Sequence, residues 1–340
     1  MIIFRCDAGP LIGFGHLNRC VELARFLSKN DESCMMIGPD KKYLAAKDSY
    51  IFSEWLSVEK WGSVKEDAKK IVHYVKKHSA KMVILDDYRV NEVYQLILKN
   101  SGVKWLQFDA SLLHPLWADY VVNANPEANI DKYKQVVRKK DSKLLLGPKF
   151  AILRPEFRLQ NPNKISPIVN KILIMFGGGD DRGAILLILK ALLSELPAEI
   201  QFLVISGANN PRNQSIKEWV KDNGNDRVEI QINPVSVASL FLSADLAIIS
   251  GGSVVYEAAS CGLPMMLISI AENQLWPIQA WANAGAAISV GELNSFDKFF
   301  LRKSVSQVVV DKNKRESLAK KASELCDGLG VKYITNSILS

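Results

Sequence analysis

Short, mostly apolar runs alternate along the whole chain with longer segments in which apolar residues recur at helical spacing. The short runs are rich in Val, Ile, Leu and Met, and Gly, Asp or Asn often follows them, as expected for strands buried inside a parallel sheet. Strands that alternate with helices in this way are typical of crossover connections, so the pattern predicts an α/β fold.

The first half of the chain is predicted to form one doubly wound layer. Predicted strands cover residues 2–5, 34–37, 82–85, 103–108 and 120–122, and predicted helices cover residues 17–29, 63–78 and 91–100. Residues 161–167 are rich in Asn, Pro and Ser and interrupt this rhythm, as an interdomain linker would.

The alternation of predicted strands and helices then begins again and predicts a second layer. Its predicted strands cover residues 171–176, 201–205, 227–231, 245–249 and 264–268, and its predicted helices cover residues 182–194, 212–222, 236–243, 253–261 and 274–284. We therefore expect two Rossmann-like parallel-sheet domains, residues 1–160 and 161–340, which agrees with a length of 340 residues. Open parallel sheets bind ligands beyond the carboxyl ends of their strands, so two such domains predict a cleft between them.

Composition places the chain among ordinary globular proteins, with 48% hydrophobic and 23% charged residues. The longest stretch without charge, residues 273–291, contains Gln, Asn and Pro and does not predict a membrane span. Arg5 and Asp7 interrupt the first apolar run, where a signal peptide requires an unbroken one. We expect a cytoplasmic protein without integral membrane association.

Cysteines and charge narrow the chemistry further. The five cysteines are odd in number and form no CxxC pair, so the sequence predicts neither a disulfide framework nor a metal site. A formal net charge of +7 favours anionic partners in general. The basic residues are dispersed over predicted solvent-exposed faces of helices and loops and form no continuous stripe. We therefore expect no nucleic-acid partner.

The first candidate site is the glycine-containing loop between the first predicted strand and the first predicted helix. Gly13 and Gly15 permit close approach of a ligand to the backbone, and His16 lies at the start of the helix. The positive end of the helix dipole disfavours imidazolium, which suits a neutral base. A purely structural hydrogen bond is the alternative for His16. Asn18 occupies the last glycine position of GxGxxG, and no phosphate-binding GxxxxGK[ST] occurs, which weakens nicotinamide and ATP as ligands.

The second candidate site follows the predicted strand at residues 245–249. Gly251, Gly252 and Ser253 offer backbone amides to a diphosphate, and Glu257 lies one helical turn further, where a carboxylate accepts hydrogen bonds from ribose hydroxyls. The alternative is that the glycines only close a tight turn and that Glu257 is solvated.

Three further strand ends carry candidate polar groups. Gly177 and Gly178 follow the first strand of the second domain, where they allow a phosphate or sugar to approach the backbone. Asn273 and Gln274 supply amides that suit sugar hydroxyls and N-acetyl groups, with a helix N-cap as the alternative role of Asn273. The adjacent Asp86 and Asp87 either hold an acid of raised pKa, orient a base, or cap the next helix.

These motifs together resemble the PseG family, which are UDP-2,4-diacetamido-2,4,6-trideoxy-β-L-altropyranose hydrolases, and their spore-coat polysaccharide relatives of SpsG type. The matching segments are residues 4–7, 12–16 with Arg19, 85–88, 123–125, 147–157 with Arg154, 176–180, 250–257 and 272–274. The resemblance implies a GT-B fold of two Rossmann-like domains in which the sugar is passed to water, with inversion at the anomeric carbon and release of UDP. It also implies a role in pseudaminic acid or other surface glycan biosynthesis.

Carried over residue by residue, the resemblance makes His16 the base that deprotonates water and places UDP near Gly252, Ser253 and Glu257. Arg154 or Arg19 would then stabilise the departing diphosphate. The predicted catalytic residues are His16 and Asp7, and the predicted substrate-binding residues are Gly13, Gly15, Arg19, Asp86, Tyr88, Arg154, Gly177, Gly178, Gly251, Gly252, Ser253, Glu257, Asn273 and Gln274. The scheme requires no metal and no cofactor, and we expect a monomer whose partner is a small UDP-sugar.

Two positions depart from the family pattern. Asp87 stands where the relatives commonly carry His, and Ala110 follows Asp109 where they carry a second acidic residue. Either change indicates another diamino sugar, another nucleotide sugar, or tolerance at a secondary position. The alternatives to a hydrolase are a GT-B glycosyltransferase with a UDP-sugar donor, a nucleotide-sugar 2-epimerase, and a non-catalytic nucleotide-sugar-binding protein.

Overall fold

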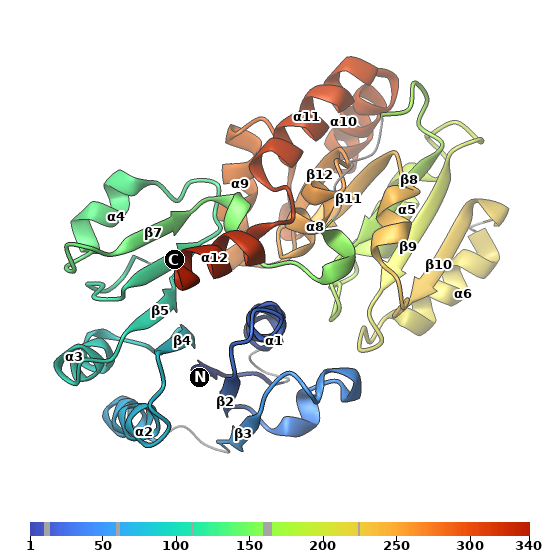
Figure 1. Cartoon of the computed structure of the whole chain (residues 1–340). Coiled ribbons are helices and arrows are strands. Elements are labelled where there is room, and N and C mark those ends of the chain that lie inside the picture. Colours follow the sequence, from blue (N-terminus) through green and yellow to red (C-terminus); the bar gives the residue numbers. More distant parts are fainter. Residues whose placement is uncertain (10–13, 59–61, 110–111, 159–164, 224) are drawn as a thin grey trace. The chain divides into compact units, whose positions relative to one another are not determined.

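A computed structural model of the chain describes residues 1–9, 14–58, 62–109, 112–158, 165–223 and 225–340 (Figure 1). The chain divides into two compact units, Met1–Arg154 with Leu329–Ser340, and Pro155–Gly328. The sequence pattern placed the boundary at residue 160 and gave the carboxyl terminus to the second domain. The last helix, α12 (Gly330–Leu339), lies in the first unit instead, because Val331 and Ile334 are buried in that unit's core.

The first unit is built on a sheet of seven strands, all parallel, in the order β3-β2-β1-β4-β5-β6-β7. The strands are β1 (Ile2–Cys6), β2 (Cys34–Gly38), β3 (Glu54–Ser57), β4 (Met82–Asp86), β5 (Trp105–Phe108), β6 (Tyr120–Asn123) and β7 (Lys143–Leu146). The order reverses between β1 and β4, and this topological switch point is where doubly wound sheets bind ligands.

Helices cover both faces of this sheet. They are α1 (Gly15–Ser28), α2 (Val64–Lys77), α3 (Glu92–Asn100), α4 (Ile130–Val136) and α12, with short 3₁₀ turns at Lys41–Tyr43, Ala46–Asp48 and Pro148–Phe150. Successive β1 side chains enter different cores: Phe4 packs in the cluster that includes α1 and α12, and Ile3 packs in the cluster that includes α2 and α3. This period of two explains why a strand buried on both faces is apolar throughout.

The second unit repeats the plan with six parallel strands in the order β10-β9-β8-β11-β12-β13. The strands are β8 (Lys171–Met175), β9 (Gln201–Ser206), β10 (Val228–Ile232), β11 (Leu246–Ser250), β12 (Met265–Ser269) and β13 (Ile288–Glu292). Numbered along the chain, this is the 3-2-1-4-5-6 order of the Rossmann fold, so its switch point lies between β8 and β11.

The second unit has an apolar core that β8, β9, β11 and β12 share with α5 and α10. The helices are α5 (Ala184–Leu192), α6 (Asn213–Asn223), α7 (Ala238–Leu242), α8 (Val254–Ser260), α9 (Leu275–Asn283), α10 (Lys298–Val310) and α11 (Lys312–Leu325), with 3₁₀ turns at Pro155–Phe157, Asn225–Arg227, Glu272–Gln274 and Leu293–Ser295. All five cysteines of the chain are buried and unbonded to one another.

The predicted α/β class and the strands and helices expected from the pattern are confirmed, with bounds that differ by a few residues. The pattern missed the three outer strands β3, β7 and β13. These strands lie at sheet edges, where half-exposed and polar side chains interrupt the apolar run. It also missed α4 and the carboxyl-terminal helices α10 to α12. Among the described residues, no helix is long and apolar enough to cross a membrane.

Candidate active site

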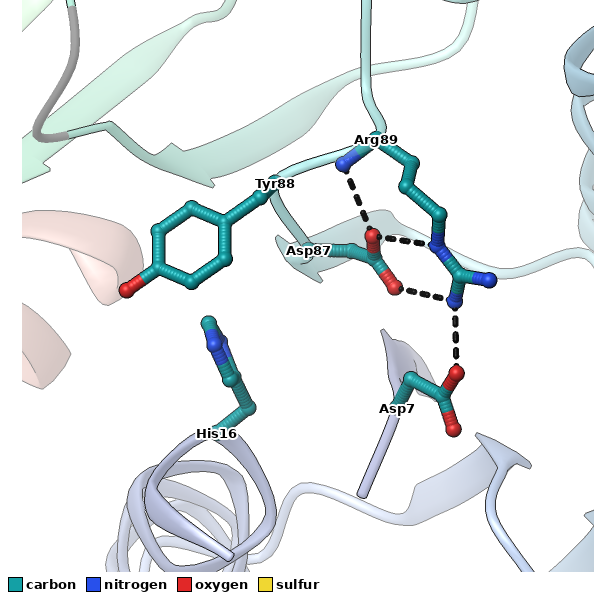
Figure 2. A pocket seen from close by; sticks show the side chains of 5 residues that line it. All are labelled: Asp7, His16, Asp87, Tyr88 and Arg89. Atoms are coloured by element: carbon teal, nitrogen blue, oxygen red, sulfur yellow. Dashed lines mark hydrogen bonds and ion pairs between the residues drawn. The ribbon is translucent and has the colours of Figure 1, made fainter. Parts of the chain in front are cut away.

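The first site lies at the switch point of the first unit. Asp7 directly follows β1, His16 lies in the first turn of α1, and Asp86 is the last residue of β4. A pocket of about 180 Å³ lies beside these residues and is lined by Asp7, His16, Asp87, Tyr88 and Arg89 (Figure 2). The loops after two neighbouring strands therefore bring together side chains that are about 80 residues apart in the sequence, as expected at the carboxyl edge of a parallel sheet.

His16 is held by Asp86. The distance from His16 Nδ1 to Asp86 Oδ1 is 2.6 Å, and the two residues are 7% and 1% exposed. Burial alone raises the pKa of Asp86, but the charge of Arg19 and hydrogen bonds from His16 and Arg19 outweigh it and hold this pKa below its usual value. An ionised carboxylate only accepts hydrogen bonds, so the contact with Asp86 favours a proton on Nδ1. In a neutral imidazole of this tautomer, Nε2 is the nitrogen that accepts a hydrogen bond.

Arg19 completes this arrangement from one turn further along α1. Its Nε donates to Asp86 Oδ2 over 2.9 Å and its Nη2 donates to Asp86 Oδ1 over 2.7 Å. Burial lowers the pKa of Arg19, but the charge of Asp86 and its hydrogen bonds give a net upward shift. The guanidinium also lies over the Phe108 ring, 5.4 Å from its centroid. The structure thus places Arg19 against Asp86, where it fixes the carboxylate that orients His16.

The contact with His16 is the geometry expected of one role left open by the sequence, in which Asp86 orients a base. The alternative of an acid with raised pKa is wrong, because the pKa of Asp86 is lowered. The alternative of a helix cap is also wrong. The side chain of Asn91 caps α3 by accepting a hydrogen bond from the Tyr94 amide.

Tyr88 packs its ring against the imidazole of His16. The ring centroids are 4.6 Å apart and the planes are nearly perpendicular, at 87° (Figure 2). Tyr88 is nevertheless 77% exposed. It therefore limits the movement of the His16 ring and leaves most of its own surface exposed beside the pocket.

Arg89 links two carboxylates on the other side of the pocket. Its Nη2 lies 2.7 Å from Asp7 Oδ2, and its guanidinium donates to both carboxylate oxygens of Asp87 over 3.0 and 2.9 Å. Asp7 also accepts a hydrogen bond from the Ala8 amide. Asp7, expected to be catalytic, is therefore ion-paired with Arg89, a residue that the sequence reasoning missed. The sequence did contain a signal for Arg89. Asp87 departs from the family pattern, and Arg89, two residues later, forms an ion pair with it.

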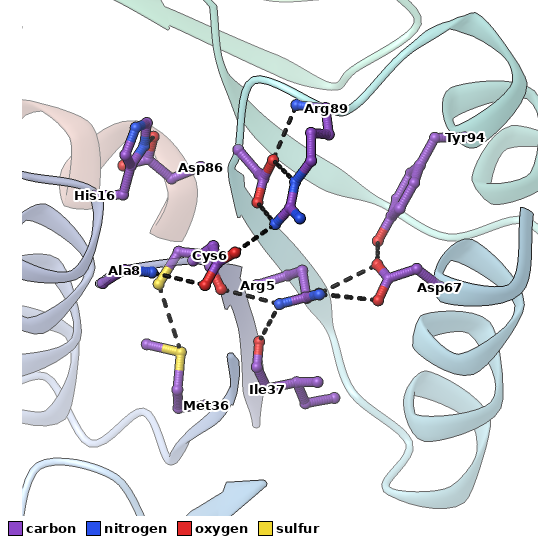
Figure 3. Close-up of polar contacts among 12 residues, drawn as sticks. Arg5, Cys6, Ala8, His16, Met36, Ile37, Asp67, Asp86, Arg89 and Tyr94 are labelled. Carbon is purple, nitrogen blue, oxygen red and sulfur yellow. Dashed lines mark hydrogen bonds and ion pairs between the residues drawn. The ribbon is translucent and has the colours of Figure 1, made fainter. Parts of the chain in front are cut away.

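A buried network lies beneath the site and holds the ends of β1 and β2 (Figure 3). Arg5 is fully buried, and its Nη1 donates to the carbonyls of Cys6 and Ile37 over 2.9 and 3.3 Å. It forms an ion pair of 2.9 Å with Asp67, which also accepts from the Tyr94 hydroxyl. Burial and the charge of Asp67 raise the pKa of Tyr94, so this hydroxyl stays protonated. The network fixes the backbone that leads into Asp7.

The remaining predicted residues of the first unit are Gly13, Gly15 and Arg154. Gly13 and Ala110 lie outside the described residues. Gly15 begins α1, and a Cβ there would meet nothing within 4 Å. Arg154 is the last residue of the first unit and is half-buried.

The second candidate site lies at the switch point of the second unit. Its glycines differ in how much space a Cβ atom would find around them. A Cβ on Gly251 would lie 2.5 Å from Ile278 Cγ1, so packing against α9 requires this glycine. A Cβ on Gly252 would meet only Ser250 Oγ at 3.9 Å, and one on Gly178 would meet nothing within 4 Å. Neither has a positive φ, whereas Gly177 has φ +83°. Room for a ligand is therefore available at Gly252 and Gly178, and Gly251 is a packing residue.

Gly207, which sequence reasoning missed, allows the loops after β8 and β9 to touch. A Cβ on Gly207 would lie 1.9 Å from the backbone oxygen of Gly178. We expect Gly207→Ala to lower the free energy of unfolding by about 1–3 kcal/mol, because backbone must move. Gly252→Ala serves as the control and should stay within about 1 kcal/mol of the parent protein. Urea unfolding measures both, and equal midpoints for the two variants would contradict this assignment of the glycines.

The polar candidates of the second unit gather around the ends of β11 and β12. Ser253 occupies the N-cap position of α8 without making a capping hydrogen bond and is exposed. Glu257 lies one turn further and is 9% exposed. Gln274 Oε1 accepts from the Ile270 amide over 3.2 Å. Asn273 is exposed in a 3₁₀ turn, and its alternative role as a cap is wrong, because Gln274 occupies the N-cap position of α9.

Two parallel α/β sheets of this order, with candidate sites at their carboxyl edges, define the class of the protein as a GT-B fold. The chain is similar to the crystal structure of MurG from Acinetobacter baumannii, with a TM-score of 0.69 and 16% identity over 99% of each chain. It is also similar to HepE from Anabaena in complex with UDP and glucose, with a TM-score of 0.60 and 14% identity over 100% of this chain and 99% of that one. The predicted GT-B fold is confirmed.

The sequence is similar to two particular proteins over most of its length. It is 26% identical over 274 residues to a UDP-2,4-diacetamido-2,4,6-trideoxy-β-L-altropyranose hydrolase from Campylobacter jejuni, covering 80% of this chain and 93% of the hydrolase. It is 24% identical over 243 residues to the spore coat polysaccharide biosynthesis protein SpsG of Bacillus subtilis. This match covers 71% of this chain and 67% of SpsG. The resemblance predicted from the motifs is confirmed. No protein family profile matches the chain.

Proposed function

We propose that this protein hydrolyses a UDP-linked 2,4-diacetamido-2,4,6-trideoxyhexose to free sugar and UDP in the biosynthesis of pseudaminic acid or a related surface glycan. The observation that carries the reaction type is the 2.6 Å contact between His16 Nδ1 and ionised Asp86, which leaves Nε2 as a base beside a pocket. The similarity to the Campylobacter jejuni hydrolase, over 93% of its length, supports the substrate class.

In the proposed mechanism, His16 Nε2 takes a proton from a water molecule as the water oxygen bonds to the anomeric carbon. The bond from that carbon to the diphosphate oxygen breaks, and UDP leaves with the electron pair. Attack opposite to the leaving group inverts the configuration. Asp86 stabilises the imidazolium that forms, because its carboxylate faces Nδ1. A positioned base of this kind contributes about 10²- to 10⁴-fold to the rate.

The second unit is proposed to bind the UDP part. Gly252 and Gly178 leave room for a phosphate to approach the backbone, and Ser253 presents an exposed hydroxyl in the same region. Glu257 is proposed to accept hydrogen bonds from the ribose hydroxyls, and Asn273 with Gln274 to face the sugar. These groups bind and orient the substrate, which accounts for the part of the rate enhancement that a base alone does not supply.

Incubation with the UDP-sugar alone in ¹⁸O-labelled water tests the reaction. We expect UDP and a free sugar with one labelled oxygen at the anomeric carbon, and NMR spectra of the first product should show the inverted anomer. Release of UDP only after addition of an acceptor would make the protein a glycosyltransferase. A changed configuration at C2 would make it an epimerase, and UDP binding without turnover would make it a binding protein.

Glu257→Ala is expected to raise the dissociation constant of UDP about 10- to 100-fold, because it removes hydrogen bonds to a charged acceptor worth about 1.5–3 kcal/mol. The value of kcat at saturating substrate should change little. Glu218→Ala is the matched control, since it removes an equal charge from an exposed position on α6, outside every candidate site. Calorimetric titration with UDP measures both variants, and an unchanged constant for Glu257→Ala would remove Glu257 from the ribose role.

A further inference from the structure

Arg182 connects the loop after β8 to the end of β12. Its Nη1 donates to the Ile270 carbonyl over 2.7 Å, a contact between residues that are 88 positions apart. In the sheet, β11 lies between β8 and β12. The Arg182 side chain therefore joins the two strand ends that flank β11, which is followed by the loop at residues 251–253. This is the switch point of the second unit, where a doubly wound sheet binds its ligand.

The backbone of Arg182 is in a conformation that only glycine adopts without cost. Its φ is +52°. Asp180 holds this conformation, because its carboxylate accepts from the Arg182 amide over 2.7 Å and pairs with Arg212. A strained non-glycine residue that its neighbours keep in place is a common feature of ligand-binding loops. The strain here places a guanidinium at the edge of the sheet.

The same contacts tie Arg182 to the residues of the proposed nucleotide site. The backbone of Ile270 accepts from Arg182 through its carbonyl and donates through its amide to Gln274 Oε1. Gln274 in turn packs against Gly251, where a Cβ would lie 3.1 Å from the Gln274 Cβ. Arg182, Gln274 and Gly251 therefore form one connected group at the ends of β11 and β12.

The charge of this group suits a diphosphate. Among the described residues, the Arg182 side chain makes one hydrogen bond, whereas a guanidinium has five N–H donors in a fork that matches phosphate oxygens. Two other arginines already have acidic partners. Arg212 forms an ion pair with Asp180, and Arg19 forms one with Asp86 in the first unit. Arg182 is exposed, so a ligand reaches it.

We propose that Arg182 binds the diphosphate of the nucleotide sugar and stabilises the negative charge that develops as UDP leaves. This inference rests on the proposed function, since it needs a nucleotide on the second unit, and it names a cation that the sequence motifs did not. Bidentate hydrogen bonds from a guanidinium to a phosphate are among the strongest that proteins form. The geometry gives Arg182 this role in place of Arg19.

Arg182→Gly is the sharpest test, because glycine accepts the positive φ and the variant removes only the side chain. We expect the dissociation constant of UDP to rise about 10- to 100-fold while that of uridine, which lacks phosphate, stays unchanged. Arg182→Lys should recover part of the UDP affinity, and Lys303→Ala, an exposed cation on α10, is the charge-matched control and should change neither constant. The unfolding midpoint of Arg182→Gly should stay close to that of the parent, because relief of the strained backbone offsets the loss of the hydrogen bond to Ile270.

The outcomes separate the two proposals. If the parent protein binds UDP and Arg182→Gly leaves the ratio of UDP to uridine affinity unchanged, the diphosphate role of Arg182 is wrong and the proposed function stands. If Arg182→Gly instead unfolds more easily and loses uridine and UDP affinity equally, Arg182 is a structural residue. Failure of the parent protein to bind UDP would overturn the proposed function and this inference with it.

Discussion

Replacement of His16 by Gln is expected to lower kcat for UDP release about 10²- to 10⁴-fold. Gln keeps a similar volume and a donor for Asp86, but its amide cannot take a proton from water at neutral pH. Binding of UDP should change little, because the proposed nucleotide site lies on the second unit and His16 on the first. Steady-state release of UDP at saturating substrate measures kcat, and calorimetric titration with UDP measures binding.

His73→Gln is the matched control for this prediction. His73 lies exposed on α2 and should tolerate the same substitution with the parent rate. A His16→Gln variant that is folded and releases UDP at the parent rate would eliminate His16 as the base. In that case the contact between His16 and Asp86 would have a structural purpose only.

Asp86→Asn is expected to have the second largest effect, a loss of about 10²- to 10⁴-fold in kcat, by analogy with the base-orienting aspartate of serine proteases. The Asn amide can donate to Nδ1, which favours the tautomer with its proton on Nε2, and this nitrogen then cannot accept a proton from water. The variant also leaves Arg19 without its charge partner. Asp87→Asn is the control, because Asp87 pairs with Arg89 and not with His16, and its kcat should fall far less.

Acid denaturation gives Asp86→Asn a second readout. The pKa of Asp86 is lowered in the folded protein, so its ionised form stabilises the fold at pH values above its unfolded pKa. This contribution is lost as the pH falls through the folded pKa. The difference in unfolding midpoint between parent and Asp86→Asn should therefore be largest near neutral pH and shrink in acid. A difference that stays constant down to the lowest pH would show that ionisation of Asp86 does not stabilise the fold.

The amino-acid pattern predicted much of the scaffold and placed both candidate sites after strands of the two sheets. Apolar runs separated by helical segments define strands buried on both faces, and such strands form parallel sheets whose carboxyl ends bind ligands. The sequence alone therefore assigns His16, Asp86 and the two glycine segments to strand ends. Local signals of this kind depend on residues close together in the chain, and a sequence displays them directly.

The partners of the charged groups could not be predicted in this way. Arg19 looked like a phosphate ligand and instead holds Asp86, 67 positions away. Asp7 looked catalytic and pairs with Arg89, 82 positions away. Several carboxylates and guanidinium groups compete at the same sheet edge, and strand order and register decide which of them meet. Gly251 illustrates the same limit, because its close contact is with Ile278 on α9 rather than with open space.

The sequence by itself determined that the chain forms two Rossmann-like layers and that glycine loops and a histidine follow their strands, because buried strands and tight turns impose residue types locally. Only the tertiary structure decided that Asp86 contacts His16, that Arg89 pairs with Asp7, and that Arg182 bonds the residue after β12. The physical reason is that ion pairs and hydrogen bonds act over about 3 Å, and the distances between distant segments are set by sheet order and packing.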